Sequence, residues 1–214
     1  MGKSLIRVGA VVGLLALGAY FGAAFLPLPA RVAYTLVFAM GPLLALSFLG
    51  MHEALAAHRR SIAAYFGCAL GFAAGVLVNL MLVIQGANNI LREEAHAGLE
   101  PPAAEQAETV WRSVNRVQFS IDVSWDIFIC LAGLLVGIAM LSHPTFGKLL
   151  GWFGIASSTL LLALNLYTFP IAPAYAGLVD LGPLVALWYG VVFARMLSVR
   201  DWSESARHAP PAPD

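Results

Sequence analysis

Residues 62–84 read IAAYFGCALGFAAGVLVNLMLVI, and this stretch decides the fold. It contains no charged side chain, and a run of about 20 apolar residues is long enough to cross the ~30 Å hydrocarbon layer of a bilayer as an α-helix. Because lipid offers the backbone no hydrogen-bond partner, such a segment must be helical. Gly67, Gly71 and Gly75 recur at every fourth position, a spacing that lets neighbouring helices approach closely. The stretch therefore predicts a closely packed transmembrane helix.

The whole chain has the same character. Of its 214 residues, 60% are hydrophobic and 11% charged, whereas a soluble domain has about 45–50% and about 25%. Twelve basic residues balance twelve acidic ones, so we expect no nucleic-acid partner. Apolar runs of spanning length cover residues 8–26, 32–55, 62–84 (with a possible extension to 90), 117–141, 149–169 and 175–197. We expect an all-α, polytopic bundle of six transmembrane helices, a single domain over residues 1–199, followed by a disordered cytoplasmic tail over 200–214.

Small residues and prolines predict details of the packing. The pairs Gly9–Gly13, Gly18–Gly22 and Gly133–Gly137 repeat the four-residue spacing of close helix contacts. Gly-Pro occurs at 41–42 and at 182–183, and a proline inside a helix removes a backbone donor and kinks it. We expect kinks in the second and sixth spans, which would then line a polar interior.

Basic residues predict the orientation. With six spans, the side that holds both termini carries eight basic residues: Lys3, Arg7, Arg59, Arg60, Lys148, Arg195, Arg200 and Arg207. The other side carries four: Arg31, Arg92, Arg112 and Arg116. The positive-inside rule places both termini in the cytoplasm. The first span follows Lys3 and Arg7 as a signal peptide would, but Leu28-Pro29-Ala30 is a poor cleavage site, so we expect the span to be retained, with cleavage as the alternative.

The longest polar segment, residues 92–115, then faces outward. It contains five glutamates and Pro101-Pro102. After the prolines, apolar side chains recur at steps of three and four residues: Ala107, Val110, Trp111, Val114 and Val117. This pattern predicts an amphipathic helix that leads directly into the fourth span.

Carboxylates inside the spans are the main functional signal, because a charge in the membrane is costly and usually faces a bundle interior. Asp122 and Asp126 lie four residues apart and share a helix face, and Asp180 is expected in the outer half of the sixth span. Asn89 and Asn165 reach the same outward level. We predict that Asp126 and Asp180, assisted by Asp122, Asn165 and Asn89, bind a cation, a proton or a small polar ligand.

Two other interpretations stay open. In the first, the protein is a non-catalytic accessory or sensor subunit whose polar residues fix helix packing, against itself or against a membrane partner protein. In the second, which the residues favour less, it is a membrane-embedded enzyme that uses the carboxylates as acid and base. Cys68 and Cys130 are read as packing residues. A metal or haem between His52 and His143 lacks a supporting motif, so we expect interfacial histidines and no cofactor.

The second half of the chain resembles a group of uncharacterised bacterial multi-pass membrane proteins. The resemblance covers roughly residues 120–197 and rests on these features: Trp125-Asp126, Gly133 to Met140, His143-Pro144, Phe146-Gly147, Gly151, Gly154, Asn165, Phe169-Pro170, the stretch Gly177 to Pro183, and Leu187-Trp188-Tyr189. More distantly it is similar to a numbered domain-of-unknown-function family with six predicted spans. The resemblance implies a bacterial cytoplasmic membrane and a signature around Asp126 and Asp180, but no activity.

Overall fold

The structure, a computed structural model, describes residues 2–199 and residue 202, and the described chain folds into six α-helices. In chain order these are α1 (Gly2–Phe25), α2 (Ala30–Ala56), α3 (Ile62–His96), α4 (Pro101–Met140), α5 (Gly147–Thr168) and α6 (Gly182–Ser198). The first five are long and apolar enough to cross a membrane. The expected all-α bundle is therefore confirmed, and the chain is a membrane-embedded protein.

The sixth helix differs from the prediction. The expected span began at residue 175, but α6 begins at Gly182 and has 17 residues, which gives it a length of roughly 25 Å. Pro183 lies in its first turn, where the missing N–H of proline costs nothing and its fixed φ favours the helix. The predicted kink in the sixth span is therefore wrong, and Asp180 lies in the loop before α6. Pro42, by contrast, lies inside α2 as expected.

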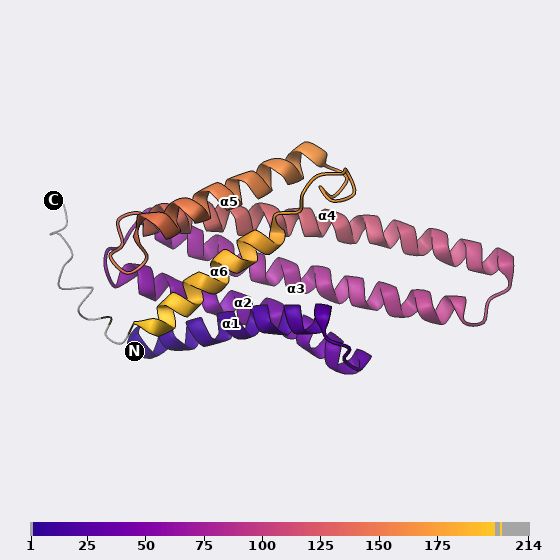
Figure 1. Cartoon of the computed structure of the whole chain (residues 1–214). Helices are drawn as coiled ribbons and strands as arrows, with labels where there is room; N and C mark the ends of the chain where they lie inside the picture. Colours follow the sequence, from indigo (N-terminus) through magenta and orange to yellow (C-terminus); the bar gives the residue numbers. More distant parts are fainter. Residues whose placement is uncertain (1, 200–201, 203–214) are drawn as a thin grey trace.

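Close glycine contacts hold neighbouring helices together. The pairs α1–α2, α2–α3, α3–α4 and α4–α5 pack side by side, and α6 packs against α1 and α5 (Figure 1). A Cβ built on Gly9 would lie 2.5 Å from the Cα of Gly50, so α1 and α2 meet backbone to backbone. A Cβ on Gly75 would lie 2.6 Å from the backbone N of Ala45, so this glycine brings α2 close to α3, whereas Gly67 faces Leu135 and Val136 of α4. Gly18 has no described neighbour within 4 Å, so that predicted pair makes no such contact.

Buried aromatic side chains fix the position of α6 in the bundle. The Tyr189 ring lies 5.5 Å from the Phe48 ring of α2, centroid to centroid, and its hydroxyl donates to the carbonyl of Ile129 in α4 at 3.2 Å. Trp188 Nε1 donates to the carbonyl of Leu150 in α5 at 2.9 Å. These polar bonds between helices, surrounded by apolar packing, define which face of α6 points inward.

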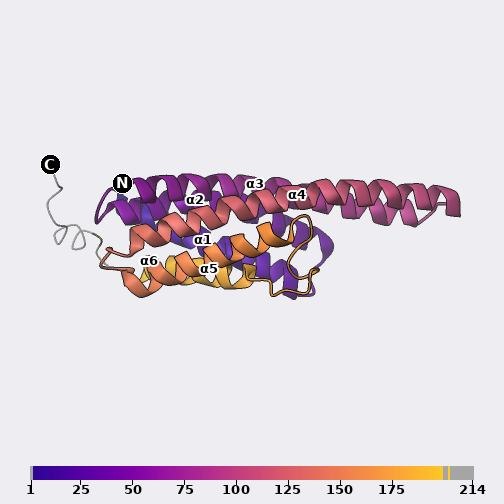
Figure 2. The same cartoon turned by 90° about the horizontal axis from the view of Figure 1, so that it is seen from above.

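The two longest helices form a projection beyond the bundle. Figures 1 and 2 show α3 and α4 continuing side by side past the ends of the other helices, and the end from which they project is opposite the start of α1. The predicted amphipathic helix is confirmed as the first half of α4, continuous with the fourth span. The third helix, however, continues through the polar residues to His96.

A cluster of charged side chains links α3 and α4 within this projection. Glu108 Oε2 accepts from Arg92 Nε at 3.1 Å, and Glu108 Oε1 accepts from Arg112 Nε at 3.1 Å. The Arg92 guanidinium lies 4.0 Å from the centroid of the Trp111 ring. The small desolvation of the Glu108 carboxylate opposes the shift, but hydrogen bonds from Arg92 and Arg112 and their charges hold its pKa below the ordinary value.

The predicted disordered tail lies, apart from Trp202, outside the described residues. Trp202 is buried, and its ring centroid lies 6.2 Å from those of Phe146 and His143. It therefore packs on the loop between α4 and α5, at the end of the bundle where α1 begins and α6 ends (Figure 1).

Candidate functional site

A cavity of about 270 Å³ lies among α1, α2, α4, α5, α6 and the loop that precedes α6. We call it the carboxylate cavity, because three aspartates line it. Asp122 and Asp126 come from successive turns of α4, and Asp180 comes from the loop. Buried Asn165 of α5 lines the same space. The structure thus brings four of the five predicted residues into one cavity.

The loop aspartate is held by the helix that follows it. Asp180 Oδ1 accepts a hydrogen bond of 2.8 Å from the backbone N–H of Gly182, at the start of α6. The free N–H groups at a helix start favour a nearby negative charge. Asp180 is exposed, whereas Asp122 and Asp126 are partly buried. The position of Asp180 in a loop, which differs from the predicted position inside a span, places it at the rim of the cavity.

Asn165, which lines this space, has an unpaired side-chain oxygen. Its side-chain amide nitrogen donates to the carbonyl of Leu161 in the same helix at 3.2 Å. Among the described residues, none donates a hydrogen bond to its Oδ1, although the residue is only 6% exposed. A buried carbonyl oxygen of this kind is an acceptor for the N–H or O–H group of a bound molecule.

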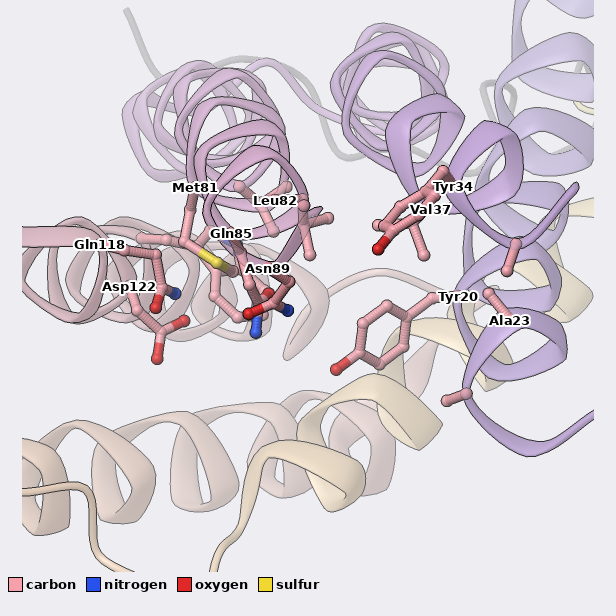
Figure 3. A pocket seen from close by; sticks show the side chains of 15 residues that line it. Tyr20, Ala23, Tyr34, Val37, Met81, Leu82, Gln85, Asn89, Gln118 and Asp122 are labelled. Carbon is pink, nitrogen blue, oxygen red and sulfur yellow. The ribbon is translucent and has the colours of Figure 1, made fainter. Parts of the chain in front are cut away.

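A second cavity of about 380 Å³ adjoins the first, between α1, α2, α3 and α4. We call it the amide cavity, after Gln85, Asn89 and Gln118 in its wall. Figure 3 shows the polar ends of Asn89, Gln118 and Asp122 on one side of the open space, facing the side on which Tyr20 and Tyr34 lie. Asn89 lines the amide cavity and not the carboxylate cavity, so it is the one predicted site residue that does not share a cavity with Asp126 and Asp180.

The two cavities share part of their walls. Tyr20, Asp122 and Trp125 line both of them. Asp122 is consequently the carboxylate that faces both spaces. Gln118 was not predicted, although its position four residues before Asp122 places it on the same face of α4. Neither was Tyr20, for which the sequence offers no signal beyond an aromatic residue near the end of a span.

Negative charge dominates the site. Among the residues that line the two cavities, none is Lys, Arg or His. Within the part of the chain that the structure describes, Asp122 and Asp126 have no hydrogen bond or salt bridge to another residue. An unpaired charge in a poorly hydrated site is unfavourable, so it either takes a proton or attracts a cation.

At the end of the bundle away from the two cavities, His143 links two parts of the chain by hydrogen bonds. His143 Nε2 donates to the carbonyl of Ala54 at 3.2 Å, and its Nδ1 accepts from the backbone N–H of Thr145 at 3.2 Å. Both ring nitrogens are used, so His143 is a buried link between α2 and the α4–α5 loop. Burial lowers its pKa to about 4, while the bond to Ala54 opposes this and the charge of His58 adds to it.

Comparison with protein-family models, curated proteins and solved structures finds no match for this chain.

Proposed function

We propose that this membrane protein binds a cation, or the proton that replaces it, in the carboxylate cavity, as a transport-type or binding-type protein. One observation carries the proposal. Asp122, Asp126 and Asp180 line one cavity in which no described residue supplies a positive charge. A ligand that brings this charge would remove the penalty of leaving carboxylates unpaired.

The same observation argues against a role for these aspartates in helix packing. Side chains that fix the packing of this bundle bond to a neighbouring helix, as Tyr189 and Trp188 do. Asp126 makes no such bond to a described residue, so its carboxylate has no packing partner that would justify its position. The accessory-subunit interpretation is the second candidate, and self-association or a membrane partner stays a prediction.

The orientation supports a site that opens outward. One end of the bundle carries six basic residues: Lys3, Arg7, Arg59, Arg60, Lys148 and Arg195. The end with the projection carries four: Arg31, Arg92, Arg112 and Arg116. Under the positive-inside rule the first end is cytoplasmic. Asp126 lies 14 residues before the end of α4, roughly 21 Å along the helix from the cytoplasmic end, which puts it in the outer part of the membrane. With the family resemblance, this favours a bacterial cytoplasmic membrane.

Thermal denaturation of the purified protein in detergent tests the proposal. Sodium, potassium, calcium and ammonium salts are added singly at constant ionic strength, and each is measured across pH 5–8. A cation at about 100 times its Kd stabilises the folded state by about 2.7 kcal/mol. For a chain of this size that raises the apparent Tm by about 5–11 °C.

Two isosteric variants supply the controls. Asp126→Asn keeps the volume of the side chain and removes its charge, so the stabilisation by cations should disappear. Glu53→Gln removes a carboxylate at the opposite end of the bundle and should leave the stabilisation by cations intact. Glu53 Oε1 lies there 3.9 Å from His52 Nδ1. If neither cations nor pH change the Tm of the unsubstituted protein while Asp126→Asn unfolds it, the aspartate is structural and the proposal is wrong.

A further inference from the structure

Building on the proposed cation site, we infer that the carboxylate cavity binds an organic ammonium ion with an apolar body. Three features carry the inference: the size of the cavity, the apolar and aromatic side chains in its wall, and unpaired amide groups beside its carboxylates. Together they describe a ligand with a charged head and a hydrophobic remainder.

The cavity is larger than a metal ion requires. Its volume of about 270 Å³ corresponds to about nine water molecules at roughly 30 Å³ each. Calcium takes six to eight oxygen ligands at about 2.3–2.6 Å and so needs its carboxylates gathered around one point. Among the described residues, no three His, Cys, Asp or Glu side chains lie close enough to hold one ion. The three aspartates therefore surround a space that a larger cation would fill.

Most of the remaining wall is hydrophobic. Apolar side chains from four helices line the cavity: Leu17, Met40, Leu44, Ile129 and Leu161. Four aromatic residues add to them: Tyr20, Phe21, Trp125 and Tyr189. Such a wall stabilises a hydrocarbon body by excluding water, and aromatic faces attract ammonium groups through the charge distribution of the ring. A small inorganic ion would gain nothing from the hydrocarbon part of this lining.

Unpaired amides supply acceptors for the ammonium head. Gln118 is only 8% exposed, has no hydrogen bond within the described chain, and points into the amide cavity beside Asp122 (Figure 3). Asn165 lines the carboxylate cavity, and its Oδ1 accepts no hydrogen bond within the described chain. A primary ammonium group has three N–H donors, which Asp122, Asp126 and an amide oxygen can accept together. Buried polar groups normally have partners, so Asn165, which lines the carboxylate cavity and whose Oδ1 accepts no hydrogen bond within the described chain, points independently to a missing ligand.

The test measures binding of four amines to the protein in lipid nanodiscs, by isothermal titration and by the change in tryptophan fluorescence. The amines are methylammonium, n-butylammonium, n-hexylammonium and 2-phenylethylammonium. 2-Phenylethanol and n-hexanol serve as uncharged controls of similar shape. Sodium and protons are titrated in parallel, so that the cation site is tested separately from the nature of the cation.

We expect affinity to rise from methylammonium to the two largest amines and the alcohols to bind at least about tenfold more weakly than the amines of matching shape. Asp126→Asn should weaken amine binding at least about tenfold. Tyr20→Leu removes one ring from the wall and should weaken the amines about fivefold. Glu53→Gln should bind the amines like the unsubstituted protein.

Three results would overturn the inference. If sodium or protons bind in an Asp126-dependent manner but no amine binds or competes, the proposed cation site stands and the organic ligand is wrong. If the alcohols bind as tightly as the amines, the cavity does not recognise charge. If neither amines nor inorganic cations bind while circular dichroism shows an intact helical fold, the inference and the proposed function both fail.

Discussion

Replacing Gly9 by alanine tests the backbone contact that joins α1 to α2. The added Cβ would lie 2.5 Å from the Cα of Gly50 and 3.1 Å from the carbonyl oxygen of Ser47. Ordinary contacts of a Cβ begin at 3.4 Å, so the two atoms overlap by about 0.9 Å. Both neighbours are backbone atoms and cannot rotate aside, so the two helices must separate.

The size of the effect follows from two opposing contributions. Overfilling a packed contact costs about 1–3 kcal/mol. Alanine favours the helix over glycine by up to about 1 kcal/mol, which offsets part of that cost. The net loss of up to about 2 kcal/mol should lower the apparent Tm by up to about 8 °C in a chain of this length.

The matched control lies in the same helix. Gly18 is exposed and has no described atom within 4 Å, so Gly18→Ala should leave the Tm unchanged or raise it. Gly50→Ala approaches the same contact from α2, and its Cβ would lie 2.6 Å from the Cα of Gly9, so it should reproduce the loss. All variants are compared in one detergent at one scan rate, because membrane proteins commonly unfold irreversibly. Equal stability of Gly9→Ala and Gly18→Ala would refute the reasoning.

Three further predictions concern other parts of the molecule. Burial lowers the pKa of His143 to about 4, against about 6.5 in the unfolded chain, so between these pH values the unfolded chain binds more protons. The free energy of unfolding therefore has its full value above pH 6.5 and should fall by at most about 3 kcal/mol as the pH drops to 4. A Tm that does not fall over this range, or that falls equally in His143→Gln, would contradict this. Glu108→Gln removes the negative charge between Arg92 and Arg112 and one of the two oxygens that accept from them, so amide hydrogen exchange in the projection should accelerate while exchange in the bundle stays the same. Unchanged exchange in both would show that the cluster does not hold the two helices together. A Cβ at Gly154 would overlap the Trp188 ring, so Gly154→Ala should lower the Tm by several degrees and shift tryptophan emission, and an unaltered spectrum would count against the contact.

The spans and the projection could be predicted from the sequence because both depend on local properties. The apolar run of residues 62–84 lies inside α3, and the pattern that includes Trp111 predicted a helix that continues into the fourth span. The sixth helix could not be delimited in this way. Residues 175–181 are apolar enough to belong to a span, yet the chain forms a loop there, with Gly177 at a φ of +78°.

The candidate site was predicted in part, for a similar reason. Asp122 and Asp126 share a face of one helix, which their spacing alone establishes. Their approach to Asp180 and Asn165 depends on the packing of α4 against α5 and on the loop that leads into α6. Asn89 lines the other cavity, because rotation of α3 about its axis is set by its contacts with α2 and α4.

The sequence by itself determined that the chain enters a membrane, since burial of apolar runs and the need to pair every backbone group are properties of each segment alone. Only the tertiary structure decided which glycines touch a neighbour, which histidine is buried and which carboxylates share a cavity. Those outcomes depend on the rotation and depth of each helix, and these are set by contacts between residues far apart in the chain.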